Sequence, residues 1–328
     1  PNLNVIINRR SFTAGEQECF NKSRIKIAIT AEKGDGDMDQ AEKQNKIAAF
    51  AMEGMLYEVT ATPKPGLVDR ANNGAHYDMD YFTFMSSAAA LRTTFDAMVS
   101  AGVKSGEQNE DIRELLPTLR EIGKRAEDRM FAFTDGVNTH KGMIFSLGVL
   151  CGCAGWLTGR NEKLSPERIC KCAREMCSGL CAQDFAHLKE KKMLSKGERM
   201  YLRYGYKGVR GVAESGYQIV RCVSLPVYTR LRESVVSIND ALVHTLLYLI
   251  KDTKDTNIVS RHDRKTAVYA SKYAACVLKE GGMGTRKGRA AVKRMDRDFI
   301  KKYISPGGCA DLLAVTHFLY RVNEEKWG

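Results

Sequence analysis

The segment Thr62–Asp80 is dense in side chains that could do acid–base or phosphate chemistry, and its two prolines and two glycines predict an irregular loop. A lysine there could meet a phosphate, and asparagines could hydrogen-bond a sugar or a base. The histidine and the acids could move protons or hold Mg²⁺. Turn chemistry, with Asp78 or Asp80 as the N-cap of the next helix, is the alternative. The candidates are Lys64, Asp69, Asn72, Asn73, His76 and Asp80.

A second polar segment, Thr134–Gly142, directly precedes an apolar run. The first N–H groups of a helix that begins there would attract an anion. A lysine at that position opposes the helix dipole unless an anion lies beside it. A turn followed by a cap at Thr139 is the alternative. The candidates are Asp135, Asn138, His140 and Lys141.

A basic stretch at 189–210 interleaves tyrosines with lysines and arginines, including Lys207 and Arg210. Aromatic rings could stack a base while the charges hold phosphates. A solvated charged loop is the alternative.

Two further segments carry carboxylates or glycines next to predicted helix ends. Asp252 and Asp255 follow an apolar helix three residues apart, which suits Mg²⁺, although a capped turn also explains them. In Ser305–Asp311 a Pro-Gly-Gly turn would expose N–H groups toward a ligand. A favourable carboxylate at a helix N-terminus is the alternative there. Five polar loops on one helical scaffold, four of them with glycine, favour a phosphate-and-sugar site over five independent turns.

Helices must position these loops, because apolar residues recur at helical spacing and prolines are few. We expect an all-α fold, a single large multi-helix bundle, with an N-terminal extension at 1–43 and a helical catalytic domain at 44–328. Short β-branched stretches at 5–7 and 25–30 could be strands or partner contacts. The predicted helices cover 41–60, 80–100, 108–130, 141–158, 166–182, 212–224, 229–252, 261–280, 288–302 and 309–323.

Composition limits the classes of partner. The formal net charge of +12 indicates nucleic acid, an anionic membrane or a phosphorylated small molecule. The longest apolar run, 143–158, is too short to span a bilayer and predicts a buried core helix. Ten cysteines without a visible secretory signal predict reduced, mostly buried thiols in a cytoplasmic protein.

Several of these segments together resemble the triphosphoribosyl-dephospho-coenzyme A synthases. The resemblance lies in Pro63–Asp69, Asn72–Asp80, Gly136–Gly142, Tyr204–Gly211, Asp255–Asn257 and Ser305–Asp311, in the family's order. It implies an all-helical enzyme that transfers the triphosphoribosyl group of ATP to the 2′-hydroxyl of 3′-dephospho-coenzyme A and releases adenine. It also implies a product that is passed to an acyl-carrier-protein-modifying transferase, for citrate lyase or malonate decarboxylase. No nucleic acid or membrane partner is expected, and an oligomer is allowed.

Such chemistry needs a carboxylate near a developing oxocarbenium ion, a base for the hydroxyl and an acid for adenine. We assign Asp80 or Asp135 as base or cation stabiliser, and His140 or His76 as proton donor. Expected substrate contacts are Lys64, Asp69, Asn72, Asn73, Asn138, Lys141, Lys207, Arg210, Asn257, Gly307 and Gly308. Expected Mg²⁺ ligands are Asp252, Asp255 and Asp311.

Two rival functions are weaker. A helical metal-dependent nucleotide phosphohydrolase would use His244, His262, Asp263 and Asp296, and would release phosphate without adenine. A nucleic-acid-binding module would use the basic runs at 189–210 and 286–302, with binding that weakens steeply with salt. The phosphohydrolase would make no use of the loops around Lys64 and His140, and the acidic loops would repel the phosphate backbone of a nucleic acid.

Overall fold

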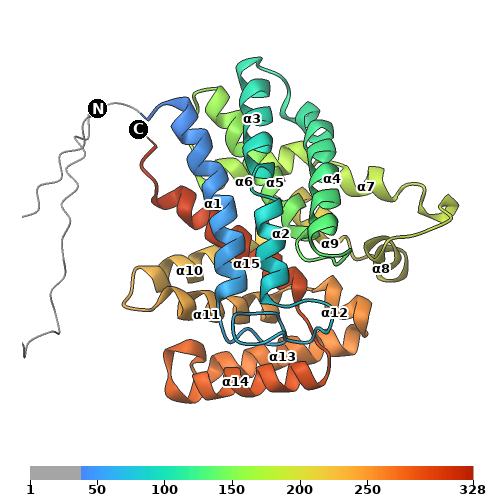
Figure 1. The fold of residues 1–328 in the computed structure, drawn as a ribbon, viewed down its shortest axis with the longest axis vertical. Helices are drawn as coiled ribbons and strands as arrows, with labels where there is room; N and C mark the ends of the chain where they lie inside the picture. The colour runs from blue at the N-terminus through green and yellow to red at the C-terminus, as the bar shows by residue number, and fades with distance from the viewer. Residues whose placement is uncertain (1–37, 328) are drawn as a thin grey trace, which may run out of the picture. The chain divides into compact units, whose positions relative to one another are not determined.

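Helix α5 (Lys141–Gly159) lies in the interior of the fold, packed against helices from both the first and the last parts of the chain (Figure 1). The computed structural model describes residues 38–327, and among these no strand occurs, so the predicted all-α class is confirmed. The stretches 5–7 and 25–30 lie outside the described residues.

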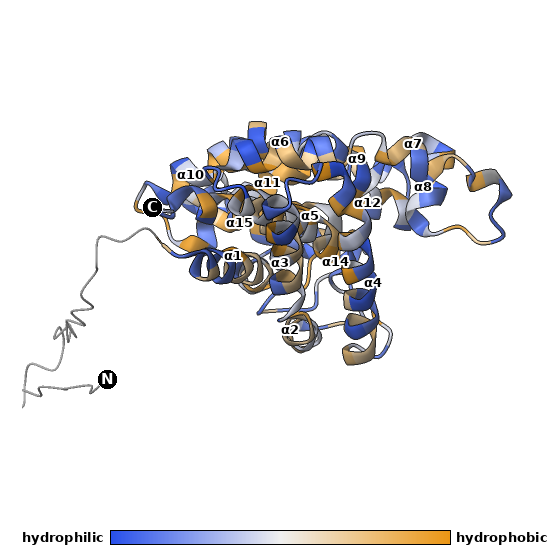
Figure 2. Cartoon of the chain, turned by 90° about the horizontal axis from the view of Figure 1, so that it is seen from above, coloured by the Kyte–Doolittle hydropathy of each residue, from blue (hydrophilic) through white to orange (hydrophobic). Residues whose placement is uncertain are grey.

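The α-helices along the described residues are α1 (Gln40–Thr60), α2 (Tyr81–Ala90), α3 (Thr94–Glu107), α4 (Leu115–Phe133), α5, α6 (Pro166–Met176), α7 (Leu180–Phe185), α8 (Lys196–Tyr204), α9 (Gly208–Glu214), α10 (Leu225–Arg232), α11 (Ile238–Asp252), α12 (Thr256–Arg261), α13 (Arg264–Lys279), α14 (Arg286–Lys301) and α15 (Gly307–Glu324). Single turns of 3-10 helix cover Ile112–Glu114, Leu188–Glu190 and Gly282–Gly284, and a π-helical turn covers Val220–Ser224. Most helices carry both hydrophilic and hydrophobic residues, as amphipathic helices do (Figure 2).

Glycines let α3 and α5 pack with their backbones in close contact. A Cβ atom on Gly102 would lie 2.1 Å from the carbonyl oxygen of Gly152, and one on Gly155 would lie 2.2 Å from that of Val99. Helix α5 is long and apolar enough to cross a membrane by length and composition alone, but 78% of its apolar window is buried inside the protein. The predicted buried core helix is therefore confirmed.

Free thiols contribute to the same interior. Nine cysteines fall within the described residues, all are free, and seven of them are buried. Burial raises the pKa of Cys170 and Cys177 to about 12, so these thiols stay protonated. They act as small apolar side chains, as predicted, whereas Cys222 and Cys276 are exposed.

Four predicted helices are wrong in detail, and helix α8 was not predicted. The helix predicted at 80–100 is broken by a turn after Ala90. The one at 166–182 stops before Gly179, which adopts a φ of +76°. The segments predicted at 212–224 and 229–252 are each divided, the latter because the Ser237 hydroxyl caps α11. The basic stretch 189–210 contains α8, which begins with a capping box between Ser195 and Glu198.

Helices α13 and α14 lie side by side below the ends of α1 and α2 in Figure 1, and the loop that joins α1 to α2 runs between the two pairs. Backbone contact fixes this loop: a Cβ atom on Gly66 would lie 2.0 Å from the carbonyl oxygen of Ile304, and its φ is +71°. This contact places the polar segment Thr62–Asp80 against the residues that lead into α15.

Candidate active site

The α1–α2 loop is held together by the Asp69 carboxylate, which is 1% exposed. One oxygen accepts hydrogen bonds from the backbone N–H groups of Ala71 (2.7 Å) and Asn72 (3.0 Å), and the other accepts from that of Lys64 (3.0 Å). These bonds close an Asx-type turn. Asp69 therefore organises the loop from within, and its oxygens do not face a substrate.

Asn72 extends the same network, whereas Asn73 is exposed. The Asn72 side chain accepts a hydrogen bond from the Gly74 N–H (2.7 Å) and donates one to Asp296 on α14 (3.4 Å). Asp296 also accepts from the Gly66 N–H (3.0 Å). Burial raises the pKa of Asp296 to about 6. Asn73, not Asn72, has the free amide of the pair predicted to bind a sugar or a base.

A buried ion pair lies behind this loop. The Lys64 ammonium contacts the carboxylate of Glu58 in the last turns of α1, and both side chains are 1% exposed. Glu58 was not among the predicted site residues. It continues the buried stripe of α1 formed by Ala51, Gly54 and Met55, where an apolar residue is expected. That placement, six residues before Lys64, is the signal in the sequence that could have identified it.

His140 begins α5 and is 1% exposed. Its Nδ1 lies 2.7 Å from the Ser87 hydroxyl, its ring meets the Phe84 ring edge-on at 4.9 Å between centroids, and its Nε2 is buried with no hydrogen-bond partner among the described residues. Burial, reinforced by the nearby Lys64 ammonium, lowers the pKa of His140 to about 3. The imidazole is therefore neutral at physiological pH.

A chain of hydroxyl groups holds this ring. Thr139 donates a hydrogen bond to the Ser87 oxygen at 2.8 Å, and the Ser87 hydroxyl lies 2.7 Å from Nδ1 of His140. His140 thus presents Nε2 as a buried polar atom without a partner among the described residues.

The start of α15 is fixed by Asp255, the N-cap of α12. One carboxylate oxygen accepts from the N–H groups of Asn257 (2.7 Å) and Ile258 (3.1 Å), and the other accepts from that of Cys309 (2.9 Å). A Cβ atom on Gly308 would lie 3.0 Å from this carboxylate. Burial raises the pKa of Asp255 despite these donors. Both oxygens are occupied by backbone donors, as the capped-turn alternative predicted.

Asn257, which is exposed, lies beside Gly307 on the outer side of the same junction. A Cβ atom on Gly307 would lie 2.9 Å from the Asn257 side-chain nitrogen. The Asn257 amide is thus adjacent to the first residue of α15, and a helix N-terminus with an amide beside it suits recognition of an anionic or polar group.

Asp311 in the first turn of α15 touches α5. A Cβ atom on Gly142 would lie 1.9 Å from an Asp311 carboxylate oxygen. Burial first, and then the negative charges of Glu58 and Asp255, raise the pKa of Asp311 well above its usual range. Four parts of the chain therefore meet in one place. They are the start of α5 (His140–Gly142), the start of α15 (Gly307–Asp311), the end of α1 and the loop that carries Lys64.

Two proton-transfer candidates lie further along the loop that carries Lys64 and at its end. Asp80 is the N-cap of α2 and one of its oxygens accepts from both the N–H and the hydroxyl of Thr83, at 2.8 Å each. These bonds lower its pKa, so the carboxylate is ionised. His76 lies 2.9 Å from the Ser305 hydroxyl, and burial followed by the Arg261 charge lowers its pKa.

Other predicted residues lie at the periphery. Asp135 and Asn138 are exposed, the former with a φ of +51° and the latter accepting from the Lys141 N–H at 3.2 Å. The Lys141 ammonium, also exposed, pairs with Glu127 on α4 at 2.5 Å.

The predicted cations of the basic stretch are already paired. Lys207 contacts Glu214 (3.0 Å), and Arg210 contacts Asp184 (2.5 Å). The stretch still approaches α12, because Gly208 lies beside Thr256.

The predicted magnesium ligands do not converge. Asp252 is exposed at the end of α11 next to Lys251 (3.2 Å), Asp255 is saturated by N–H donors, and Asp311 faces Gly142. Between residues 38 and 327 no group of three or more His, Cys, Asp or Glu side chains is arranged to hold a metal ion. The outline expected for a phosphohydrolase is equally dispersed: His262 lies 2.9 Å from the Tyr303 carbonyl oxygen, and Asp263 caps α13.

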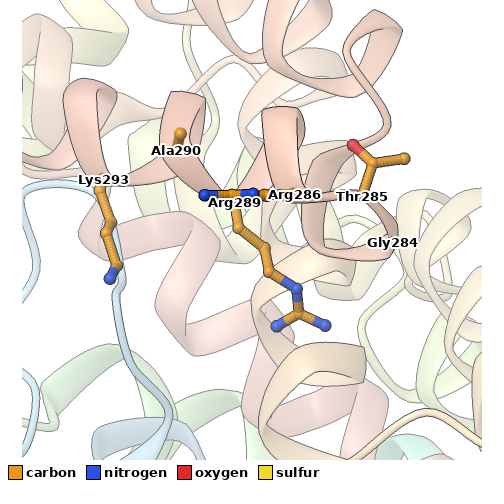
Figure 3. Close-up of a pocket in the computed structure, with 6 residues that line it drawn as sticks. All are labelled: Gly284, Thr285, Arg286, Arg289, Ala290 and Lys293. Atoms are coloured by element: carbon orange, nitrogen blue, oxygen red, sulfur yellow. The ribbon is translucent and has the colours of Figure 1, made fainter.

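Two surface pockets of about 380 Å³ each lie away from the place where α1, α5, α15 and the Lys64 loop meet. The first is on α14 and is lined by cationic side chains, with Arg289 paired to Asp240 at 2.7 Å (Figure 3). It contains none of the predicted site residues. The second includes His262 and Ile304, directly before the Ser305 that meets His76.

Comparison with known proteins gives a consistent family. Residues 44–328 match the model of the CitG family, described as ATP:dephospho-CoA triphosphoribosyl transferase. The chain is 41% identical over 276 residues to a probable 2-(5''-triphosphoribosyl)-3'-dephosphocoenzyme-A synthase of Vibrio cholerae, covering 84% of this chain and 88% of that protein. It is 40% identical over 273 residues to the synthase of Escherichia fergusonii, covering 83% and 89%. A probable synthase of Lactiplantibacillus plantarum is 41% identical over 276 residues, covering 83% and 95%. No solved structure matches the chain significantly.

Proposed function

This chain belongs to the ATP:dephospho-CoA triphosphoribosyl transferase family and is a triphosphoribosyl transferase, and we propose that its reaction takes place where α1, α5, α15 and the α1–α2 loop meet. The observation that carries this proposal is the convergence of segments far apart in the sequence: the Glu58–Lys64 pair, His140, Asp255 and Asp311. Four of the five polar segments that sequence analysis singled out contribute to it or border it.

The transfer breaks the bond between C1′ of the ATP ribose and N9 of adenine, and the electron pair stays on adenine. A new bond forms between C1′ and the 2′-oxygen of 3′-dephospho-coenzyme A, whose proton goes to a base. Positive charge develops on the ribose, as in glycoside cleavage, so an ionised carboxylate beside it stabilises the transition state.

We assign Asp80 as the base or cation stabiliser in preference to Asp135. The Thr83 donors keep Asp80 ionised and use only one of its oxygens. It also follows the loop that carries Lys64, and the neighbouring Tyr81 hydroxyl lies 3.3 Å from Thr60 at the end of α1. Asp135 is on the exposed turn before α5 and has no such connection.

The phosphates are assigned to helix N-termini rather than to the predicted lysines. The first N–H groups of α15 at Gly307 and Gly308, with Asn257 beside them, offer donors to an anion. Lys64 is enclosed with Glu58, so its role is to compensate that carboxylate and shape the loop. Lys141 is the exposed cation at the start of α5 and could exchange Glu127 for a phosphate.

Magnesium enters this proposal with the triphosphate. Mg²⁺ commonly keeps several waters and binds through substrate phosphates and one or two carboxylates. The set Asp252, Asp255 and Asp311 does not fit a shared ion, because the first is exposed and pairs with Lys251, and the second is saturated by backbone N–H donors. We therefore route no step through a protein-held metal.

The cellular setting is proposed from the resemblance in the sequence. The product would serve an acyl-carrier-protein-modifying transferase in the assembly of citrate lyase or malonate decarboxylase. The buried reduced thiols suit the cytoplasm, where ATP is also available.

The test is adenine release. The full chain is incubated with ATP, Mg²⁺ and 3′-dephospho-coenzyme A, and adenine and the adduct mass are followed by chromatography with mass detection. Equal amounts of adenine and a triphosphoribosyl adduct are expected. ADP, AMP or free phosphate without adenine would contradict the proposal and support a phosphohydrolase.

A further inference from the structure

The proposed reaction brings two phosphorylated substrates to one point. The triphosphate of ATP and the diphosphate of 3′-dephospho-coenzyme A both carry negative charges, which repel each other at short range. Each phosphate chain also extends away from the sugar that reacts, so the groups that bind it are expected beside the reacting centre. The start of α15 with Asn257 offers one such place. The second chain needs cationic side chains of its own nearby.

A surface pocket of about 380 Å³ lies where α13 begins and where the chain leads into α15. Two lysines line it, Lys265 and Lys302, and both are exposed. Neither forms an ion pair with a carboxylate between residues 38 and 327, whereas Lys207 and Arg210 of the basic stretch are already paired. The two ammonium groups are therefore available to an anion.

The other side chains of the pocket leave these charges in place. The Asp263 carboxylate also lines the pocket, but one of its oxygens accepts from the N–H (2.7 Å) and the hydroxyl (2.8 Å) of Thr266 as the N-cap of α13. The Lys302 ammonium lies 5.6 Å from the centroid of the Tyr269 ring, a cation–π contact that holds it at the pocket wall. The lysines outnumber the acid, so the pocket favours a negatively charged ligand.

A series of contacts joins this pocket to the proposed active site. Nε2 of His262, which lines the pocket, lies 2.9 Å from the carbonyl oxygen of Tyr303. The preceding residue, Arg261, lies 3.5 Å from the His76 ring. His76 in turn lies 2.9 Å from the hydroxyl of Ser305, two residues before α15. The pocket is therefore continuous with the segment that leads into α15.

Arg261 extends the positive charge of the pocket toward the start of α15. It follows Asn257 by four residues on α12, so the two side chains lie on one face of that helix. Asn257 lies beside Gly307, the first residue of α15. Arg261 is exposed and has no ion pair with another described residue. Arg261, Lys265 and Lys302 thus form a cationic surface that begins one helical turn from the start of α15.

We propose that this pocket, with Arg261 at its edge, binds the phosphate chain of one of the two substrates. The assignment rests on the proposed transfer reaction. Lys265 and Lys302 bind phosphate oxygens as point charges. No bond to phosphorus changes in the reaction, so these contacts are equally strong in the ground state and in the transition state. Such contacts lower KM and leave kcat unchanged.

The first test measures binding of inorganic triphosphate to the full chain by isothermal titration calorimetry at about 0.15 M salt. Lys265→Gln and Lys302→Gln should each weaken binding by about 10-fold or more, because each removes a charged hydrogen-bond donor. Lys302→Arg keeps the charge and should stay within about 3-fold of wild type. Lys293→Gln removes the same charge from the other surface pocket, on α14 (Figure 3), and as the matched control should change binding by less than about 2-fold.

The second test identifies which substrate supplies the phosphate chain. Adenine release is measured for the same variants while ATP and 3′-dephospho-coenzyme A are varied in turn. KM for one of them should rise by about 10-fold, with kcat within about 3-fold of wild type. A rise in KM for ATP assigns the triphosphate to the pocket, and a rise in KM for 3′-dephospho-coenzyme A assigns the diphosphate.

The failure of this proposal and the failure of the proposed function give different results. If wild-type protein does not bind inorganic triphosphate, or if Lys265→Gln and Lys302→Gln behave as Lys293→Gln does, the pocket is not a phosphate site, and adenine release by the wild type still supports the transferase. A loss confined to kcat would also overturn the proposal. If the wild type releases no adenine, the proposed function fails, and calorimetry alone decides whether the pocket binds phosphate.

Discussion

Replacing Lys64 by methionine should strongly destabilise the protein. The Lys64 ammonium and the Glu58 carboxylate are each 1% exposed and contact one another. Removing one partner of a buried pair leaves an uncompensated charge and costs about 3–5 kcal/mol. At about 2–4 °C per kcal/mol for a chain of this class, the midpoint of thermal unfolding should fall by about 6–20 °C.

The pair can be separated from simple packing by a double-mutant cycle. Glu58→Gln leaves the ammonium buried and should also destabilise, whereas Glu58→Gln with Lys64→Met removes both charges. The double variant should lose less than the sum of the single losses, by about 2 kcal/mol or more. Thermal and urea-induced unfolding followed by circular dichroism measures all four proteins.

A surface pair provides the control. Lys124 and Glu121 lie 2.6 Å apart on α4 with both side chains more than 60% exposed. Lys124→Met should cost less than about 1 kcal/mol. If Lys64→Met costs no more than this control, or if the two single losses simply add, the ion pair is not the buried interaction described here.

Three more outcomes are expected. The pKa of His140 is about 3 in the folded state and 6.5 in the unfolded chain, so between these pH values the unfolded chain binds one more proton. The free energy of unfolding should therefore fall by about 2 kcal/mol from pH 7 to pH 5. Urea titrations of His140→Gln should not show this loss. The pKa of Asp296 is about 6, above its usual 3.8, so the folded state binds the extra proton and its contribution should decline as pH rises from about 4 to 6; a curve for Asp296→Asn that keeps the decline would refute this. Gly142→Ala would press on Asp311 and should slow adenine release at least about 10-fold while costing about 1–3 kcal/mol; unchanged release would contradict the contact.

Long helices with an uninterrupted pattern were predictable. The expected ranges 41–60 and 141–158 correspond to α1 and α5 within one residue at each end. Local capping also worked, since Ser165 accepts from the Arg168 N–H and Pro166 opens α6. These features depend on residues close in sequence, so a single chain contains the information for them.

The interruptions were less predictable because tertiary contacts decide them. The turn after Ala90 contains neither glycine nor proline, and its Leu91 is fully buried. The division before α11 depends on Ser237, which lies in the mixed polar and apolar segment 230–240 and caps α11 with its hydroxyl. In such places packing against distant helices outweighs local propensity.

The sequence predicted which loops form the site better than it predicted the role of each side chain within them. The segments around Lys64, His140 and Asp311 do meet, but the polar side chains chosen within them often serve the backbone, as Asp69 and Asp255 do. A carboxylate that accepts N–H groups and one that faces a substrate look alike in a sequence. Only the count of donors around each one separates them.

The number of hydrogen-bond donors around a carboxylate also explains why two aspartates of one site can have pKa values shifted in opposite directions. Asp80 caps a helix, and its Thr83 donors lower its pKa; Asp311 has no donors and lies near two other carboxylates, which with burial raise its pKa. Two acids whose pKa values are pushed apart in this way differ in protonation at the same pH. The Lys64 ammonium contacts Glu58, whose negative charge is one of the causes of the raised pKa of Asp311. The buried ion pair is therefore expected to matter for the protonation state of the site as well as for stability.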